Sequence, residues 1–405
     1  LFRSHPLELL DENFELMVKN PGIRYDNPMV ARALEKGIPV WTEVELAYLV
    51  SEAPIIGITG SNGKTTTTTL VGEILKKCYP EVFVAGNIGI PYTSIVEKTT
   101  EQTVTVTEIS SFQLETIVDF KPDVCAVLNI TPDHLDRHGT VEVYAQTKES
   151  IGKNQTKDQV MVLNYEDDTT RAMADRANGT VLFFSLHHKI KEGVSMEGDA
   201  FIIEENGKKQ IVCTLDDVNL LGDHNYENIL AAIAVTYSMG VPVSYIKEGI
   251  KRFKGVEHRI EYVDTVKGVA YYNDSKGTNV GATLAAIDGL GAAIEVKHGK
   301  LALILGGQGK GQDFKPLRDA IQKYVKSAIL IGEDAAVIEQ AIQGTTVIQH
   351  ATSLSEAVAL AQKYTQAEDV VLLSPACASF DMFKSYNDRG HQFVACVNAL
   401  NENKN

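Results

Sequence analysis

The sequence predicts an α/β protein built from parallel sheets covered by helices, with more than one domain. The first observation is that short apolar strands alternate with helical segments from residue 54 to residue 131, as in a parallel sheet with helices on both faces. The second is that the same alternation starts again after Gly255, which predicts a further doubly wound unit. The third is the length of 405 residues, which suggests two or three domains.

The expected elements follow in order along the chain. Residues 1–50 combine short apolar segments with a helix that ends near Gly37, and we interpret them as a small α/β unit that is incomplete at its start. Buried strands that end in polar or glycine-bearing turns come next, at 54–59, 81–86, 103–110 and 123–131. These four strands are expected to form a largely parallel sheet whose carboxyl ends gather ligands.

The stretch from residue 160 to residue 213 is predicted to be more antiparallel than the sheet before it. It contains a hairpin pattern over 200–215 with its turn at Asn206-Gly207, and a helix is expected over 225–240. The second strand–helix series then has strands at 269–275, 301–307, 327–332, 345–350 and 369–376.

Composition excludes several classes of function. The chain has 38 Lys and Arg against 53 Asp and Glu, a net charge of -15, which argues against binding of nucleic acid or an anionic membrane surface. Its five cysteines form no CxxC pair and suit reduced thiols. No apolar run reaches the ~20 residues of a membrane span, and the first residues lack a signal-peptide core. We therefore expect a cytoplasmic protein, and a monomer.

The strongest motif is a glycine loop between an apolar strand and a helical segment. Residues 58–66 read Ile-Thr-Gly-Ser-Asn-Gly-Lys-Thr-Thr, although the strict phosphate-loop pattern has glycine in place of Ile58. Glycines let backbone N–H groups surround a phosphate, and a lysine reaches the outer phosphates. The candidate ATP ligands are Gly60, Asn62, Gly63, Lys64, Thr65 and Thr66, with Thr65 placed to bind Mg²⁺. The alternative is a glycine turn before an ordinary helix.

Two further side chains, Glu108 and His134, suggest cation sites near this loop. Glu108 ends a predicted strand, where an acid beside a phosphate loop commonly positions Mg²⁺. His134 lies in a polar loop after the next strand and could complete a second cation site. Lys148 shares a helix face with Tyr144. Taken singly, each has a simpler interpretation: a solvated or capping acid, a surface histidine and an exposed helix lysine.

The last third of the chain holds three polar turns after predicted strands. Asp274, Ser275, Lys276 and Thr278 lie in the first of them. In the second, Lys310 stands in a glycine loop, where its ammonium could bind a carboxylate without steric obstruction. The third, residues 374–381, is rich in small residues whose N–H groups can meet an anion. Flexible turns are the alternative, and Cys377 has no apparent partner that would make it a nucleophile.

These motifs together resemble those of the Mur ligase family. They occur in order over nearly the whole chain, from Asn20-Pro21-Gly22-Ile23 to Arg389-Gly390. The motifs are TGSNGKTT (59–66), GNIG (86–89), EISSFQLE (108–115), LNITPDHLDRH (128–138), YAQTK (144–148), HNYEN (224–228), HRIE (258–261), NDSKGTN (273–279), GGQGKGQDF (306–314) and SPACASFD (374–381).

The resemblance implies a three-domain α/β architecture. Residues 1–50 would belong to an N-terminal Rossmann-like domain for the UDP-linked substrate, incomplete because the family's opening strand and glycine loop are missing. Residues 51–255 would form the central ATP-binding domain with its parallel sheet. Residues 256–405 would form a C-terminal Rossmann-like domain for the incoming amino acid.

The resemblance also implies roles for individual residues. Thr65 and Glu108 would bind one Mg²⁺, and His134 and Lys148 a second, with Lys148 carbamylated so that a cation becomes a carboxylate-like ligand. Asn87 would contact the muramoyl substrate. The nucleotide or the closing domain would be surrounded by Asn225, Asn228, Arg259, Asp274 and Lys276. The incoming D-glutamate would be held by Thr278, Lys310, Ser379, Phe380 and Tyr386, of which Tyr386 replaces a phenylalanine of the best-known relatives.

The expected activity is an ATP-dependent ligation of D-glutamate to UDP-N-acetylmuramoyl-L-alanine, through an acyl phosphate, in peptidoglycan precursor synthesis. The absence of a DNPR-like motif favours D-glutamate over diaminopimelate as the added amino acid. A ligase similar to folylpolyglutamate synthase shares the phosphate loop and the modified lysine, but the motifs at 273–279 and 374–381 disfavour it. A nucleotide switch that hydrolyses ATP without making a bond is the alternative from a different class.

Overall fold

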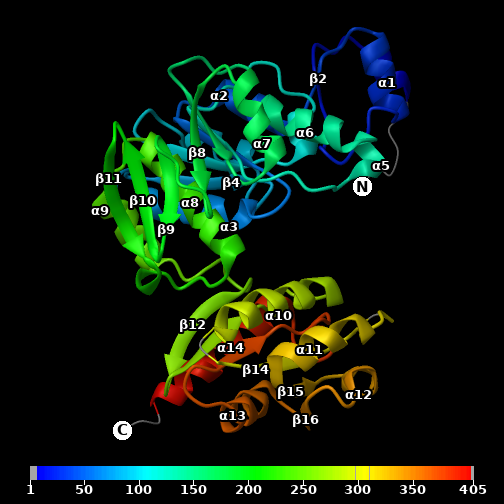
Figure 1. The fold of residues 1–405 in the computed structure, drawn as a ribbon. Coiled ribbons are helices and arrows are strands. Elements are labelled where there is room, and N and C mark those ends of the chain that lie inside the picture. Colours follow the sequence, from blue (N-terminus) through cyan, green and yellow to red (C-terminus); the bar gives the residue numbers. More distant parts are fainter. Residues whose placement is uncertain (1–6, 297, 310, 403–405) are drawn as a thin grey trace. The chain divides into compact units, whose positions relative to one another are not determined.

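The computed structural model describes residues 7–296, 298–309 and 311–402, and the chain divides into two compact units (Figure 1). The first unit comprises Leu1–Asp217 and Glu227–Arg252, and the second comprises Val218–Tyr226 and Phe253–Asn405. The division into three domains at residues 50 and 255 stays a prediction.

The first unit is organised around a nine-stranded sheet with the order β11-β10-β9-β8-β7-β6-β3-β5-β4. Its strands are β3 (Ile55–Thr59), β4 (Val82–Gly86), β5 (Val104–Glu108), β6 (Val124–Val127), β7 (Val160–Asn164), β8 (Thr180–Ser185), β9 (Gly193–Glu197), β10 (Ala200–Glu205) and β11 (Lys208–Thr214). Neighbours from β4 to β9 pair in parallel, which confirms the predicted parallel sheet. The carboxyl ends of β3, β5 and β6 therefore meet at one edge.

The antiparallel prediction for residues 160–213 is wrong for its first half. The strands β7, β8 and β9 extend the parallel sheet, and antiparallel pairing begins between β9 and β10. The short helix α7 (Asp168–Met173) supplies the crossover between β7 and β8. It was not predicted, because a helix of six residues is too short to show a clear helical period in the sequence. The hairpin is confirmed, because Asn206 and Gly207 both have positive φ between β10 and β11, as a tight hairpin turn requires.

Helices cover both faces of this sheet. On one face, Val44 of α2 (Glu43–Val50), Tyr144 of α6 (Val141–Glu149) and Met173 of α7 share a buried cluster with Phe83 and Val127. On the other face, α3 (Lys64–Leu75) packs its Gly72 against Val84, and α9 (Val243–Arg252) packs against α3. Strands that are buried at every position, such as β3 and β6, need helices on both faces of the sheet.

A small lobe precedes this sheet. It consists of the parallel strands β1 (Met17–Val18) and β2 (Val40–Trp41) with the helix α1 (Pro28–Glu35). Asn27 caps α1 by accepting a hydrogen bond from the Met29 amide, and Gly37 follows the helix with φ +73°, which confirms the predicted glycine stop.

The second unit is a six-stranded sheet with the order β12-β13-β17-β14-β15-β16. The strands are β12 (Glu261–Val266), β13 (Val269–Asn273), β14 (Leu301–Gly306), β15 (Val325–Ile331), β16 (Val347–His350) and β17 (Val370–Leu373), and the helices are α10 (Val280–Glu295), α11 (Arg318–Tyr324), α12 (Ala335–Ile342), α13 (Leu354–Tyr364) and α14 (Tyr386–Glu402). The five predicted strands are confirmed, and β12 is an antiparallel edge strand that the sequence pattern did not predict.

Two buried clusters show that this second sheet is doubly wound. Leu303 and Leu305 of β14 pack with α10, α11 and α12, whereas Ala302 and Ile304 of the same strand pack with α13 and α14. Successive residues of a strand point to opposite faces, so the two clusters lie on the two sides of the sheet. Among the residues that the structure describes, no helix has the length and apolar character needed to cross a membrane.

Candidate active site

The phosphate-loop motif lies where the sequence placed it, between β3 and α3. Gly60 and Gly63 both have positive φ, at +149° and +81°. A Cβ on Gly60 would lie 3.0 Å from the Cβ of Leu128, and one on Gly63 would lie 2.1 Å from Oδ1 of Asn228. The loop backbone is held by the segment that follows β6, since the Asn62 amide donates to Asn129 Oδ1 over 2.8 Å. Both glycines are therefore required by the close approach of other segments.

Lys64 and Thr65 open α3 and point into the site. The Lys64 ammonium donates to the carbonyls of Gly60 and Ser61, at 2.8 and 2.7 Å, and so lies above the loop. Thr65 Oγ1 donates to Glu108 Oε2 over 2.8 Å, and Asn87 Nδ2 donates to Glu108 Oε1 over 2.7 Å. Glu108 ends β5 and is buried. Two potential oxygen ligands of a hard cation, from Thr65 and Glu108, are thus adjacent. Thr66 follows in the first turn of α3.

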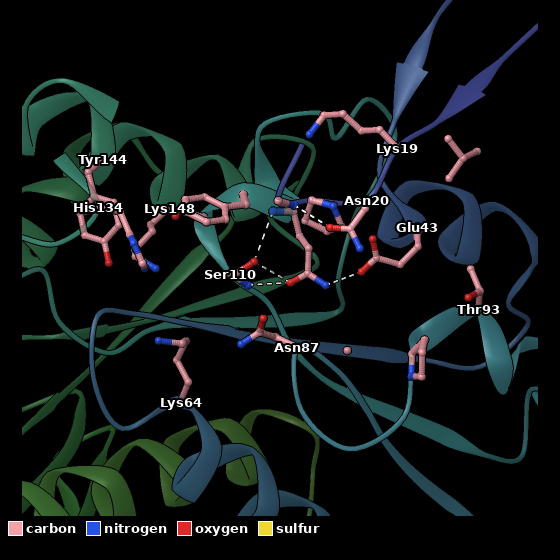
Figure 2. A pocket seen from close by; sticks show the side chains of 18 of the residues that line it. Lys19, Asn20, Glu43, Lys64, Asn87, Thr93, Ser110, His134, Tyr144 and Lys148 are labelled. Atoms are coloured by element: carbon pink, nitrogen blue, oxygen red, sulfur yellow. Dashed lines mark hydrogen bonds between the residues drawn. The ribbon is translucent and has the colours of Figure 1, made fainter. Parts of the chain in front are cut away.

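A cavity of about 640 Å³ opens beside these groups (Figure 2). Figure 2 shows Lys148, Tyr144 and His134 on one side of it and Lys19, Asn20 and Glu43 on another, with Asn87 between the two groups and Lys64 below the first. The lining residues are Val18, Lys19, Asn20, Pro21, Gly22, Glu43, Lys64, Gly86, Asn87, Pro91, Thr93, Ser110, Ser111, Phe112, Gln113, Asp133, His134, Tyr144 and Lys148. Lys64, His134 and Lys148 therefore converge on one cavity, and Glu108 is connected to it through its hydrogen bond to the lining residue Asn87.

Lys148 is a buried lysine with an unusual environment, not an exposed helix residue. Its side chain is 2% exposed, and Nζ donates to Gly60 O over 2.8 Å and to Thr59 Oγ1 over 3.3 Å. Burial, and then the charge of Lys64, lower the pKa of Lys148 to about 7 against smaller opposing effects of acidic neighbours. A substantial neutral fraction of this amine therefore exists at neutral pH.

The loop before α5 (Leu135–His138) carries His134 on the rim of the cavity. His134 has a left-handed backbone with φ 51°, and its half-exposed ring lies 4.9 Å from the Phe112 ring, centroid to centroid. Tyr144 approaches from α6, with its hydroxyl 3.1 Å from Ser61 Oγ and its ring 4.8 Å from the Lys148 Nζ. His134 and Lys148 thus line the same cavity, as the predicted second cation site requires.

The helix α8 (Asp223–Ser238) carries the two asparagines predicted to bind nucleotide. Asn228 Oδ1 accepts a hydrogen bond from Thr67 Oγ1 over 3.3 Å and is the group that a Cβ on Gly63 would strike, so Asn228 lies against the phosphate loop. One turn earlier, Asn225 donates to the Leu221 carbonyl over 2.8 Å.

In the second unit, two of the polar turns come together around a buried arginine. Arg389 is fully buried, and its guanidinium donates to Ser275 Oγ (2.9 Å), Ser275 O (2.8 Å) and Cys377 O (3.1 Å). Asp274, 5% exposed, accepts a 2.6 Å hydrogen bond from Ser374 Oγ, and burial raises its pKa to about 7. The turns after β13 and β17 therefore form one polar cluster.

The remaining predicted residues of this unit have mixed placements. Ser379 is buried, whereas Phe380 is 66% exposed. Thr278 N donates to Lys276 O in the turn after β13, and the carbonyl of Tyr386 at the start of α14 accepts from Ser275 Oγ. Arg259 lies in the turn before β12. The roles of these residues toward substrate or nucleotide stay predictions, and Lys310 lies outside the described residues.

Burial raises the pKa of the Cys377 thiol to about 12. A thiol that stays protonated at neutral pH is a poor nucleophile, which agrees with the expectation from sequence.

Comparison with known proteins defines the family. The family model described as "Mur ligase middle domain" matches residues 58–236, and the model described as "Mur ligase, glutamate ligase domain" matches residues 258–377. A protein named UDP-N-acetylmuramoylalanine--D-glutamate ligase from Acinetobacter baylyi is 49% identical over 95% of this chain and 85% of its own length. The chain belongs to the Mur ligase family. A protein of the same name from Lachnoclostridium phytofermentans is 44% identical over 97% of this Mur ligase and 86% of its own length.

Solved structures show the same fold. A UDP-N-acetylmuramoyl-L-alanyl-D-glutamate--2,6-diaminopimelate ligase matches with a TM-score of 0.65 and 18% identity, over 92% of this Mur ligase and 89% of that chain. The MurF ligase from Thermotoga maritima in complex with ADP matches with a TM-score of 0.60 and 19% identity, over 96% and 99% of the two chains. Both likenesses confirm the predicted α/β architecture of this Mur ligase.

Sequence reasoning assigned no role to several residues of these sites. Asn20, Pro21 and Gly22 line the cavity, and their Pro-Gly turn signal was visible in the sequence. Ser110 and Gln113 also line it and belong to the motif at 108–115, in which only Glu108 was given a role, whereas nothing in the local pattern marks Glu43. Arg389 ends the run of family motifs but was given no role, because arginine is rarely fully buried and its acceptors here are backbone carbonyls and a hydroxyl distant in sequence.

Replacing Gly63 with alanine tests the phosphate loop of this Mur ligase. The left-handed backbone at position 63 and the clash of the added Cβ with Asn228 should destabilise the protein by about 1–3 kcal/mol and weaken ADP binding by about 10-fold. Gly198→Ala is the matched control, because Gly198 has φ +62° but a Cβ added there would meet no atom within 4 Å. Thermal unfolding and ADP titration of both variants provide the measurement. Equal effects of the two substitutions would contradict the role of the close approach.

Proposed function

We propose that this Mur ligase uses ATP to join D-glutamate to UDP-N-acetylmuramoyl-L-alanine in peptidoglycan precursor synthesis. The observation that carries the proposal is the single cavity in which the phosphate-loop Lys64 lies together with His134 and the buried Lys148. Such a cavity suits a reaction in which a phosphoryl group and a second anionic reactant must approach each other. The names of relatives that are 44–49% identical over nearly the whole chain support the choice of substrates.

The proposed reaction has two steps. The carboxylate of the L-alanine residue attacks the γ-phosphorus of ATP, and ADP leaves as the bond to its oxygen breaks, giving an acyl phosphate. The neutral amine of D-glutamate then attacks the acyl carbon, and a tetrahedral intermediate collapses with loss of phosphate and a proton. Lys64 offsets the negative charge that gathers on the transferred phosphoryl group, and Asn87 orients the muramoyl substrate.

The residues around the loop fit a requirement for Mg²⁺. Thr65 Oγ1 and Glu108 Oε2 lie 2.8 Å apart and are the oxygen donors that a first ion would use. His134 and Lys148 would hold a second ion, for which the lysine must first lose its positive charge. The ions, when bound, supply charge that reduces repulsion between the two anionic reactants.

Carbamylation is the proposed route by which Lys148 becomes a ligand. The neutral amine attacks carbon dioxide, an N–C bond forms and a proton is released, which leaves a carbamate oxygen to bind the cation. The pKa of about 7, caused first by burial, supports this step because it maintains the neutral amine near physiological pH.

The second unit is proposed to bind the amino acid. Thr278, Ser379, Phe380, Tyr386 and Lys310 are assigned to D-glutamate, whose second carboxylate calls for a cation, and Arg259, Asp274 and Lys276 to the nucleotide. The same proposal includes the three-domain division at residues 50 and 255, a monomeric state and a cytoplasmic location. Sedimentation of the purified protein would test the monomer.

The experiment that tests the function measures phosphate release from ATP in the presence of UDP-N-acetylmuramoyl-L-alanine. D-glutamate, L-glutamate, L-lysine and no amino acid are compared, and we expect release with D-glutamate alone. Release that does not depend on an amino acid would support a nucleotide switch and overturn the proposal. Activity with tetrahydrofolate and L-glutamate would instead favour a folylpolyglutamate synthase-like ligase.

A further inference from the structure

Arg137 lies in α5, three residues after His134, and makes contacts to two other segments. Its guanidinium forms a bidentate pair with Glu115, with Nε–Oε1 at 2.8 Å and Nη2–Oε2 at 2.6 Å. Nη1 also donates to Gly22 O over 3.1 Å, and Nη2 to Ile23 O over 3.4 Å. The guanidinium stacks 4.2 Å from the centre of the Phe112 ring. Only 8% of the Arg137 side chain is exposed, so water competes little for these donors.

The segment that receives the two outer hydrogen bonds is the loop over residues 19–25. Within it, the Asn20 side chain accepts from the Gly22 amide over 2.9 Å, and the buried Lys19 ammonium donates to Ile23 O over 3.0 Å. The loop is therefore a structured turn held by its own hydrogen bonds. Its residues Asn20, Pro21 and Gly22 form one wall of the cavity.

Glu115 lies just after α4 (Ser111–Leu114), beside a second wall of the cavity. Ser111 and Phe112 line the cavity, and His138 of α5 contributes a further contact through Nε2 to Ser111 Oγ at 3.0 Å. The Tyr25 hydroxyl also donates to Glu115 O over 3.3 Å. Arg137 thus connects the loop over 19–25, the wall at 111–115 and the helix that follows His134.

We propose that Arg137 is a positioning residue that sets the distance between the loop over residues 19–25 and the His134–Lys148 side of the cavity for the UDP-linked substrate. A bidentate guanidinium with further donors to two carbonyls fixes orientation in a way that a single contact cannot. A substrate that touches both walls is held correctly for reaction when their separation is fixed. The inference rests on the proposed function for the identity of the substrate.

The test compares Arg137→Gln and Arg137→Lys with a matched control. Arg171→Gln removes an arginine of the same unit that likewise pairs with an acid, Asp168, donates to the Tyr165 carbonyl and stacks on the Tyr165 ring. For Arg137→Gln we expect Kd and KM for UDP-N-acetylmuramoyl-L-alanine to rise about 10-fold or more, with KM for ATP within about twofold. Arg137→Lys keeps the positive charge but loses the bidentate guanidinium, so its Kd and KM should be intermediate. Arg171→Gln should have the Kd and KM of the wild type.

Calorimetric binding of UDP-N-acetylmuramoyl-L-alanine without ATP keeps this test separate from the ligase reaction. Hydrogen exchange of the peptide over 19–25 gives a local readout and should speed up in Arg137→Gln but not in Arg171→Gln. If Arg137→Gln does not fold, Glu115→Gln weakens the same pair and should raise the same Kd. A folded Arg137→Gln with wild-type Kd and exchange would overturn the inference, whereas a wild type that binds the substrate without ligating it would overturn the proposed function alone.

Discussion

Replacing Lys148 with alanine is expected to lower kcat by about 10³-fold, while the protein still folds. The substitution removes the group that would become a ligand of the second Mg²⁺ and leaves His134 without its partner ligand. Truncating this buried side chain should lower the free energy of unfolding by about 2–4 kcal/mol, which is less than the stability of a typical domain. Phosphate release with all three substrates, together with thermal unfolding, provides the measurement.

Carbon dioxide and pH distinguish a carbamylated Lys148 from a simple cation. Below pH 7 the amine becomes increasingly protonated and cannot attack carbon dioxide, so removal of dissolved carbon dioxide should reduce wild-type activity more at pH 6 than at pH 8. Added bicarbonate should restore the wild type and have no effect on Lys148→Ala. Lys153→Ala is the control, because Lys153 also donates to a backbone carbonyl but lies outside the cavity. Full activity of Lys148→Ala would eliminate the second-cation assignment.

Replacing Lys64 with alanine is expected to reduce kcat/KM for ATP by about 10²–10³-fold. The Lys64 ammonium is held above the phosphate loop by the carbonyls of Gly60 and Ser61, where it would meet the transferred phosphoryl group. Because this charge should matter most in the transition state, kcat should fall more than the affinity for ADP.

Lys76→Ala provides the matched control for this second substitution. Lys76 follows the last residue of α3 and forms an exposed ion pair with Glu73, so its loss should change neither rate nor binding measurably. Stopped-flow phosphate release and ADP titration separate the two quantities. A Lys64→Ala variant whose ADP affinity and kcat fell equally would show that the lysine contributes uniform binding instead.

Much of the fold was predictable because local patterns agree with the tertiary structure. The apolar runs of β3, β5 and β6 are buried on both faces, and a glycine loop directly before α3 restricts that segment to a phosphate-loop conformation. The β7–β8 pairing was not predictable, because the direction of a strand depends on the crossover between strands, and α7 is too short to leave a clear helical period. The edge strand β12 likewise lacks a continuous apolar run.

The candidate site was predicted residue by residue but not as a cavity. The local pattern around Lys64, Glu108 and Lys148 placed each of them at a strand end or on a helix. That they lie close together in space depends on the order of strands in the sheet, which the local pattern does not give. The burial of Lys148 and the network around Arg137 arise from contacts between residues that are 88 and 115 positions apart, such as Lys148 with Gly60 and Arg137 with Gly22. No local pattern encodes such contacts.

An inhibitor that filled the cavity beside Lys64 and Lys19 would gain affinity from anionic groups that pair with their ammonium groups. Such a compound would cross a lipid bilayer poorly, because transfer of a charged group out of water is costly. The Phe112 ring, with the Arg137 guanidinium stacked on it, and Pro21 both line the same cavity and offer apolar surface there. A neutral aromatic fragment that packs on this surface would bind by burial of apolar area, and so gives medicinal chemistry a membrane-permeable starting point.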